Sequence, residues 1–317
     1  MIKLEQVSKY FGETAAVKNI SLKVAEKENM VLLGTSGCGK TTTLKMINRL
    51  IDKYTGEIFV DGKNTSQQNP EDLRKGIGYV MQNIGLFPHY TVEENIAVVP
   101  KLLKWDKKRT AERTRELVAK LHLSDSSLTM FPHELSGGQQ QRVGLARALV
   151  ADPPILLMDE PFGALDNVTR SSIQQEFKAL EELQRKTILM VTHDVQEAFE
   201  LADRICLMDK GEIVQTGTPK DLLYNPVNTF ARQFFDGQRL TLELMVVKLH
   251  DIWDELKTPG HHQNLEEIDI NTNIWDTLER LRSIGRQQLS VKNGDSVKEI
   301  DFGSVTEAFN KYQFQKP

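Results

Sequence analysis

Residues 34–41 carry the clearest chemistry in this chain, with the sequence Gly-Thr-Ser-Gly-Cys-Gly-Lys-Thr. They match the pattern G-x-x-x-x-G-K-[ST], in which a glycine-rich loop wraps phosphate groups. The apolar run 30–33 predicts a strand before the loop, and the residues after Thr41 predict a helix. The loop amides and the positive helix end can then converge on phosphate oxygens. Lys40 adds a positive charge near the β- and γ-phosphates, and the Thr41 hydroxyl can bind Mg²⁺. We therefore predict a nucleotide site.

Two further strands end in polar residues that could act on a bound phosphate. Residues 153–160 form an apolar run that ends in Asp159 and Glu160, and the run 187–191 is followed closely by His193. Such strands are typical of parallel sheets, whose ligands bind at the carboxyl ends of the strands. Glu160, one residue beyond Asp159, can orient water for phosphoryl transfer. For His193, a surface histidine at a helix start is the alternative.

The rest of the first two thirds of the chain predicts an α/β fold, because strands and helices alternate. Residues 1–33 alternate apolar and polar side chains like a β-hairpin, and residues 91–150 are predicted to be largely helical. A helix at 170–185, a strand at 204–208 and a hairpin near Gly211 complete this domain.

Two aromatic residues precede the first turn. Tyr10 and Phe11 lie just before Gly12, a short distance upstream of the phosphate loop. They could stack on adenine, or they could cap a small sheet. Composition alone does not separate the two.

Composition bounds the class of protein. The 317 residues are enough for two domains, and 39% apolar and 26% charged residues are ordinary for a globular protein. No apolar run approaches the roughly 18 residues that span a bilayer, and residues 1–5 lack the core of a signal peptide. We expect the chain to stay in the cytoplasm unless a partner holds it at a membrane. The net charge of −4 argues against a nucleic-acid binder, and Cys38 and Cys206 are expected to be unpaired thiols.

Residues 135–142, Leu-Ser-Gly-Gly-Gln-Gln-Gln-Arg, make the interpretation more specific. Together with the phosphate loop, Gln82, the acidic strand and His193, this run resembles the ATP-binding-cassette (ABC) ATPase family over roughly residues 2–236. The resemblance implies an α/β P-loop NTPase cassette in residues 1–236. It would contain a RecA-like core sheet, an N-terminal antiparallel β subdomain and an α-helical signature subdomain at about 88–150.

The resemblance also implies roles for single residues. Gln82 would contact Mg²⁺ and the attacking water, Asp159 would hold Mg²⁺ through water, and Glu160 would be the general base. His193 would contact the γ-phosphate, and Phe11 would stack on adenine. The implied catalytic residues are Glu160, His193, Gln82 and Lys40, and the implied metal ligands are Thr41, Gln82 and Asp159. The implied ATP-binding residues are Phe11, Gly34, Thr35, Ser36, Gly37, Cys38, Gly39, Lys40, Thr41, Thr42, Ser136, Gly137, Gly138, Gln139 and Asp166.

Residues 82–105 indicate which group of ABC proteins the chain resembles most. Residues 82–96 resemble the part of bacterial importers that receives a coupling helix from the membrane subunit, and residues 97–105 look most like osmoprotectant importers of glycine betaine, carnitine or choline. This resemblance implies integral membrane permease subunits, an extracytoplasmic substrate-binding protein and a place at the cytoplasmic face of the membrane. Importers of methionine, polyamines or betaine-like thiol compounds are alternatives. A soluble ABC ATPase of translation or DNA repair is a further one.

Residues 237–317 are predicted to form a separate small α/β domain. Thr241–Leu256 predicts a helix, 288–291 and 297–300 predict strands, and Ser304 to Glu307 predicts the capping box of a last helix. The order strand–helix–strand–strand–helix resembles one CBS (cystathionine-β-synthase-type) repeat, which implies a regulatory domain. A dimerisation or packing domain without a ligand is the alternative. His261 and His262 predict a loop rather than a metal site, because two adjacent histidines lack other ligands.

Ser136, Gly137 and Gly138, which resemble the signature loop of the ABC family, predict a homodimer in the ATP-bound state. In that family, the signature loop contacts the γ-phosphate of the ATP held by the opposite subunit. Because this chain carries only one set of motifs, the resemblance implies that a second copy is needed. The variant Glu160→Gln should bind ATP without hydrolysing it, so that dimers accumulate. Light scattering with ATP would measure this, and monomers alone would contradict the prediction.

Overall fold

The computed structural model describes residues 1–163, 165–256, 265–283, 288–294 and 296–315. The chain forms two units, Met1–Thr216 and Gly217–Pro317. The sequence-based boundary at 236/237 lies later than this division. The difference arises because residues 217–236 pack with the C-terminal residues: Tyr224 lies against their apolar core, and Lys220 pairs with Asp251 at 2.6 Å.

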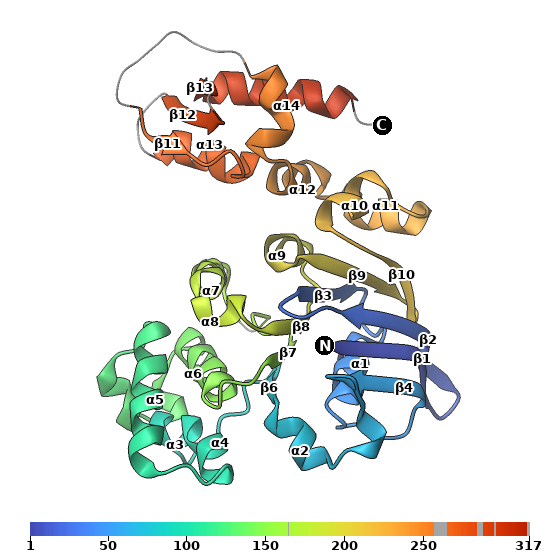
Figure 1. Cartoon of the computed structure of the whole chain (residues 1–317), viewed down its shortest axis with the longest axis vertical. Coiled ribbons are helices and arrows are strands. Elements are labelled where there is room, and N and C mark those ends of the chain that lie inside the picture. The colour runs from blue at the N-terminus through green and yellow to red at the C-terminus, as the bar shows by residue number, and fades with distance from the viewer. Residues whose placement is uncertain (164, 257–264, 284–287, 295, 316–317) are drawn as a thin grey trace. The chain divides into compact units, whose positions relative to one another are not determined.

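A four-stranded antiparallel sheet opens the first unit, as the alternating pattern predicts (Figure 1). Its strand order is β2-β1-β4-β5. The first two strands pair from Ile2 with Val24 to Phe11 with Thr14 around the turn at Gly12. The strands of this sheet are β1 (Ile2–Phe11), β2 (Thr14–Val24), β4 (Thr55–Val60) and β5 (Lys63–Asn64).

A six-stranded sheet forms the centre of the same unit, with the order β10-β9-β3-β8-β7-β6. The pairs β9–β3, β3–β8, β8–β7 and β7–β6 are parallel, so their carboxyl ends lie along one edge. Every residue of β7 and of β8 is buried, which explains the continuous apolar runs. The strands are β3 (Asn29–Gly34), β6 (Ile77–Val80), β7 (Ile155–Asp159), β8 (Thr187–Val191), β9 (Arg204–Asp209) and β10 (Glu212–Gly217).

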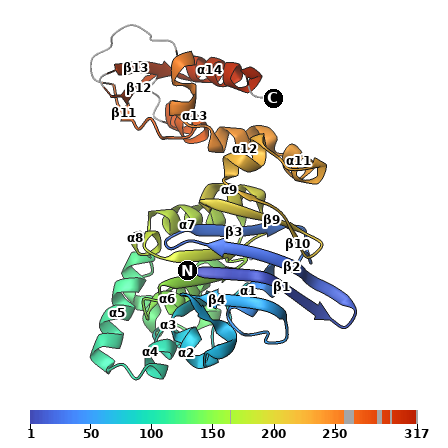
Figure 2. The ribbon, with the colours of Figure 1, turned by 45° about the vertical axis from the view of Figure 1, so that its right-hand side comes forward.

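Helix α1 (Lys40–Ile47) joins the two sheets into one core (Figures 1 and 2). Leu44 and Ile47 are fully buried in a cluster that also holds Leu4 of β1 and Leu157 of β7. Burying apolar surface contributes about 25 cal/mol per Å², so this shared core holds the phosphate loop on a rigid support.

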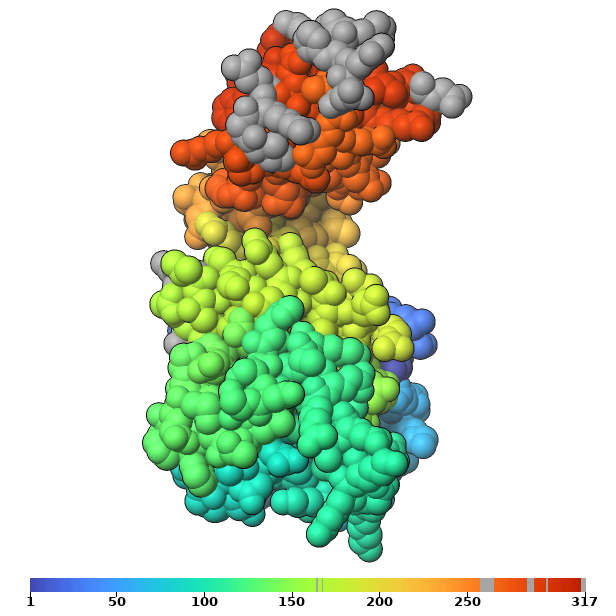
Figure 3. All heavy atoms as spheres, turned by 90° about the vertical axis from the view of Figure 1, so that its left-hand side faces the viewer, coloured from blue at the N-terminus to red at the C-terminus, as the bar shows by residue number. Residues whose placement is uncertain are grey.

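The segment at about 88–150 is largely helical, as predicted, and its atoms, teal to green, form much of the face in Figure 3. No helix in the part of the chain that the structure describes is long and apolar enough to cross a membrane. The α-helices of the first unit after α1 are α2 (Pro70–Lys75), α3 (Val92–Ile96), α4 (Val98–Leu102), α5 (Lys107–Lys120), α6 (Gly137–Leu149), α7 (Asn167–Ala179), α8 (Glu181–Gln184) and α9 (Val195–Leu201). Short 3₁₀ turns are η1 (Thr65–Gln67), η2 (Asp125–Thr129) and η3 (Pro132–Glu134).

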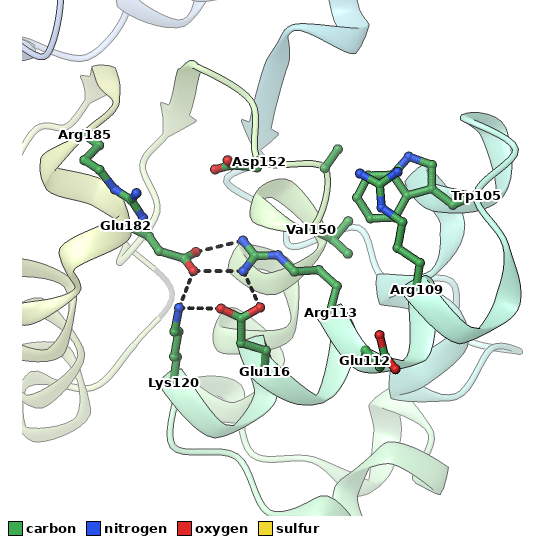
Figure 4. A pocket seen from close by; sticks show the side chains of 11 residues that line it. Trp105, Arg109, Glu112, Arg113, Glu116, Lys120, Val150, Asp152, Glu182 and Arg185 are labelled. Carbon is green, nitrogen blue, oxygen red and sulfur yellow. Dashed lines mark hydrogen bonds and ion pairs between the residues drawn. The ribbon is translucent and has the colours of Figure 1, made fainter.

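A buried carboxylate joins α5 to α8 (Figure 4). Glu182 is 3% exposed. Arg113 donates to its two oxygens at 3.0 and 3.1 Å, and Lys120 donates to one of them at 2.7 Å. The network lines a surface pocket of about 410 Å³, where the guanidinium of Arg109 stacks 3.7 Å from the centre of the Trp105 ring. A buried charge is costly unless it is paired, so this network fixes the helical segment to the core.

The second unit has a three-stranded sheet, β11-β12-β13, with β11 parallel and β13 antiparallel to β12. Its order β11-α13-β12-β13-α14 follows the predicted strand–helix–strand–strand–helix order. The CBS-like character stays a prediction. The elements of this unit are α10 (Pro219–Tyr224), α11 (Thr229–Asp236), α12 (Arg239–Val246), η4 (Leu249–Glu255), β11 (Glu267–Ile268), α13 (Ile274–Ser283), β12 (Gln288–Asn293), β13 (Ser296–Asp301) and α14 (Phe302–Gln315).

Two helix predictions in this unit are wrong in detail. The single helix at Thr241–Leu256 ends at Val246, because the amides of Leu249 and His250 donate to carbonyl oxygens at 272 and 270 instead of continuing the helix. The last helix starts at Phe302, ahead of the predicted cap. Asp301, just before the helix, is the capping residue, and its Oδ1 accepts a hydrogen bond from the Ser304 amide at 2.6 Å. The residues 261 and 262 lie outside the described part of the chain.

The helix predicted at 170–185 is also divided. Leu180 adopts extended backbone with ψ of 104° between α7 and α8. Leu180 is only 9% exposed. Because tertiary packing contributes more to helix stability than local propensity does, burial of this residue is favoured over one continuous helix.

Gly78 sets how closely α6 approaches β6. A Cβ atom on Gly78 would lie 2.6 Å from the Ala148 carbonyl oxygen and 2.8 Å from Leu156 Cδ1. Gly78→Ala should therefore lower the free energy of unfolding by about 1–3 kcal/mol through overpacking. Gly76→Ala is the control, because its Cβ would meet only the Leu73 carbonyl oxygen at 3.6 Å. Urea unfolding of both variants measures the difference, and equal stability of the two would contradict the packing argument.

Candidate nucleotide site

The phosphate loop joins the end of β3 to the start of α1. A Cβ atom on Gly34 would lie 2.1 Å from the Met208 carbonyl oxygen, and one on Gly39 would lie 2.4 Å from the Ala16 carbonyl oxygen. Only glycine allows the neighbouring strands to approach this closely. Gly37 and Gly39 also have φ angles of 77° and 103°, which side chains disfavour. The loop backbone is therefore packed tightly against β9, through Met208, and β2, through Ala16.

Lys40 lies inside this loop. Its ammonium donates to the carbonyl oxygens of Gly34 and Thr35 at 2.9 and 3.0 Å, and the residue is 5% exposed. Cys38 points into the core, and burial raises the pKa of its thiol. Cys38 and Cys206 are both free thiols, as predicted. The loop thus holds one buried positive charge, and the Cys38 thiol belongs to the core.

A hydroxyl and a carboxylate meet beside the loop. Thr41 Oγ1 donates to Asp159 Oδ1 at 2.7 Å. Asp159 is 4% exposed, and burial raises the pKa of its carboxyl while the Thr41 hydrogen bond opposes the rise. Mg²⁺ prefers oxygen ligands and needs only one or two carboxylates beside water and substrate phosphates. The hydroxyl and the carboxylate are of the kind that Mg²⁺ prefers. Among the described residues, no group of three or more His, Cys, Asp or Glu side chains could hold a metal ion without such further ligands.

Glu160 is held by side chains that follow the two neighbouring strands. Gln82 Nε2 donates to Glu160 Oε2 at 2.9 Å, and His193 Nδ1 lies 3.2 Å from the same oxygen. The Glu160 amide donates to the Val191 carbonyl oxygen at 2.9 Å, and its φ angle is 45°. A left-handed non-glycine residue is strained, and such strain clusters at functional sites. The carboxyl ends of β6, β7 and β8 thus bring together three of the four predicted catalytic side chains, with Gln82 and His193 on the Glu160 carboxylate.

Other predicted residues lie at helix starts. Ser136 is the N-cap of α6 and forms a capping box with Gln139. Gly138 packs under α7, because a Cβ there would lie 2.7 Å from Thr169 Cγ2. Asp166 caps α7 by accepting from two of its amides at 3.1 Å. The hydrogen bonds of these residues are to their own helices, so they do not join the cluster around Glu160 within one chain.

Phe11 remains on the surface. It is 52% exposed, with the Lys9 ammonium 4.6 Å from its ring centre. Tyr10 is 56% exposed. Both Phe11 and Tyr10 are therefore accessible to an adenine ring, and the assignment of Phe11 as the stacking residue stays a prediction.

Sequence reasoning did not single out the residues that support His193. The Thr192 hydroxyl donates to Glu197 and accepts from the Asp194 amide at 3.0 Å. Asp194 caps α9 and accepts from Arg170 at 3.2 Å. The Asp-x-x-Glu spacing at 194–197 is a capping signal that could have revealed part of this. Arg170 had no such signal, because its partner is 24 residues away in the sequence.

Comparison with known proteins decides the family. Residues 17–163 match the family model described as ABC transporter. The glycine betaine/carnitine/choline transport ATP-binding protein OpuCA of Bacillus subtilis is 56% identical over 310 residues, which cover 98% of this chain and 78% of that protein. The chain belongs to the ABC transporter family.

Further relatives of this ABC cassette agree. The glycine betaine uptake system ATP-binding protein YehX of Escherichia coli is 50% identical, over 78% of this chain and 80% of that protein. The choline transport ATP-binding protein OpuBA of Bacillus subtilis is 55% identical over 76% of this chain, which spans 63% of that protein's length. The predicted family and the resemblance to osmoprotectant importers are confirmed.

Solved structures confirm the cassette fold. The dimeric ABC transporter cassette MJ0796 has a TM-score of 0.62 and 38% identity, and it covers 69% of this chain and 98% of its own. A post-hydrolysis state of the same cassette, bound to ADP and Pi, has a TM-score of 0.61 and 37% identity, with the same coverage. The ABC cassette described here is accordingly an ATP-binding protein.

Glu197, beside this site, is a buried acid. It is 5% exposed, and burial raises the pKa of its carboxyl to about 7, against the hydrogen bond from Thr192. The negative charges of Asp194 and Glu160 act in the same direction as burial, and the Arg170 cation opposes them.

This buried acid predicts a pH-dependent stability. The folded protein binds the Glu197 proton more tightly than the unfolded chain does, because the pKa of this carboxyl is about 4.5 in the unfolded chain. The stabilisation is therefore complete below pH 4.5 and is lost as the pH rises through 7. Between pH 5 and 8, wild type should lose up to about 3 kcal/mol of unfolding free energy relative to Glu197→Gln. Urea unfolding at several pH values tests this, with the exposed Glu181→Gln as a control that should run parallel to wild type.

Proposed function

We propose that this protein is the ATP-hydrolysing subunit of an importer for a compatible solute such as glycine betaine, carnitine or choline. The observation that carries the proposal is the 56% identity to OpuCA over 98% of the chain. Spermidine/putrescine import proteins are 39% and 43% identical, so uptake of a polyamine is less well supported. Uptake of methionine or a betaine-like thiol compound, and a soluble ABC role, remain the alternatives.

The phosphate loop would bind the nucleotide and neutralise its charge. Lys40 and the loop amides would bind the β- and γ-phosphates, where charge develops during phosphoryl transfer. Thr41, Gln82 and Asp159 would hold Mg²⁺, which supplies further charge neutralisation when bound. The Lys40 ammonium already lies within the loop, where it donates to the carbonyl oxygens of Gly34 and Thr35.

The cluster around Glu160 would act on water. Its carboxylate would orient a water molecule and accept a proton as the water oxygen bonds to the γ-phosphorus. The bond from that phosphorus to the bridging oxygen breaks in the same reaction. Gln82 and His193 both contact one carboxylate oxygen, which fixes the orientation of the base. His193 is exposed and would also reach the γ-phosphate.

A second copy of the chain would complete each site. Ser136 and Gly137 are exposed at the start of α6, where they can face another protomer. Each ATP would lie between the phosphate loop of one protomer and residues 136–139 and Asp166 of the other. The solved MJ0796 cassettes are described as dimeric, which supports this arrangement.

The remaining partners would be membrane proteins. Integral membrane permease subunits would receive the motion through residues 82–96 and hold the protein at the cytoplasmic face of the cell membrane. An extracytoplasmic substrate-binding protein would deliver the solute. Residues 237–317 would form a CBS-like regulatory or dimerisation domain. With a net charge of −4, we propose no nucleic-acid partner.

Reconstitution tests the proposal. Proteoliposomes that contain the protein, its permease and its binding protein should accumulate radiolabelled glycine betaine, carnitine or choline only with ATP. Lys40→Ala and Glu160→Gln should each lower ATP hydrolysis and uptake by at least a hundredfold, because charge neutralisation or the base is lost. Glu181→Gln, at an exposed residue of α8 that contacts none of the predicted site residues through a hydrogen bond or ion pair among the described residues, should behave as wild type. ATP hydrolysis without uptake of any of the three solutes would overturn the substrate assignment, and no hydrolysis would overturn the proposal itself.

A further inference from the structure

We infer that Arg170 is a positioning residue for hydrolysis, which links the segment before α7 to the turn that carries His193. The inference rests on the proposed ATP hydrolysis. Arg170 lies in the first turn of α7, and its side chain is 26% exposed. One terminal nitrogen donates to the Leu165 carbonyl oxygen at 3.1 Å, and the other contacts Asp194 Oδ2 at 3.2 Å. The guanidinium therefore spans two segments that are distant in sequence.

The two ends of this link lie next to groups of the site. Asp194 follows His193 directly, and Leu165 precedes Asp166, which would face the nucleotide of the partner in the proposed dimer. A planar guanidinium with two fixed donors sets the separation of its two acceptors more closely than a flexible ammonium does. A shift of the segment at Leu165 is thus transmitted to the turn at His193.

The receiving end of the link is rigid. Asp194 uses Oδ1 to accept from the Glu197 amide at 3.1 Å, which caps α9, and its own amide donates to the Thr192 hydroxyl at 3.0 Å. The Thr192 amide donates to the Leu32 carbonyl oxygen at 3.1 Å, so the turn is tied to β3. The backbone of this turn is thus held on both sides of His193. The Nδ1 atom of His193 lies 3.2 Å from Glu160 Oε2. Arg170 therefore acts on the geometry of that pair through the backbone and touches neither side chain.

The main test is Arg170→Met in the full chain, with ATP hydrolysis measured at varied ATP concentration. Misplacing His193 should lower kcat roughly ten- to hundredfold, while KM for ATP changes less than about twofold, because the phosphate loop is untouched. Lys178→Met is the matched control. Lys178 also joins α7 to α9, through Glu200 at 3.0 Å, but lies away from both turns. It should leave kcat within about twofold of wild type.

Two further variants separate positioning from simple loss of an ion pair. Arg170→Lys keeps the charge but not the fork, so it should recover only part of kcat. Asp194→Asn keeps a cap for α9 and weakens the contact with Arg170. If the two residues act as one link, the double variant Arg170→Met/Asp194→Asn should lose no more than about twofold in kcat beyond Arg170→Met alone.

The outcomes are distinguishable. Binding of a fluorescent ATP analogue and the thermal unfolding midpoint establish that each variant is folded. Active wild type with an unchanged kcat in Arg170→Met overturns the inference and leaves the proposed function standing. An equal loss in Lys178→Met, or losses in kcat that multiply fully in the double variant, also overturns it. Inactive wild type overturns the proposed function and removes the basis for a positioning role.

Discussion

The parallel pairing of β7 with β8 is the constraint on which the site depends. Asp159 pairs with Val191, and the amide of Glu160 extends the ladder by donating to the Val191 carbonyl oxygen. This register places the residues after one strand beside those after the next, so Glu160 lies against His193. Side chains alternate along a strand, so a shift of one residue would turn Asp159 away from Thr41. One register therefore sets both the Thr41–Asp159 hydrogen bond and the cluster around Glu160.

Burial gives the polar groups of this sheet edge their rigidity. Lys40, Asp159 and Glu197 are each at most 5% exposed and hydrogen-bonded. A buried polar group that loses its partner costs on the order of 1–3 kcal/mol, so each group holds its neighbour in place. Ser136 and His193, in contrast, are exposed and can meet a nucleotide or a second protomer. The cassette thus combines a fixed interior with accessible side chains at its surface.

Much of the fold could be predicted because its signals are local. The phosphate loop, the apolar strands around 155–159 and 187–191, and the strand pair after residue 288 all follow from spacing within a few residues. The errors have a tertiary origin. The helix at Thr241–Leu256 is interrupted because its backbone pairs with residues 270–272, and the domain boundary moves because Tyr224 packs on a core formed by later residues. Neither partner is visible in a local pattern.

The sequence by itself determined the nucleotide site, the α/β class and the family, because glycine spacing, strand composition and ordered motifs are properties of short segments. Only the tertiary structure decided that Gln82, Glu160 and His193 share one carboxylate oxygen, since this depends on strand order and register. It alone also revealed Arg170, whose two acceptors come together through the packing of α7 and α9 on the sheet. Contacts between distant residues depend on packing geometry, which no single segment encodes.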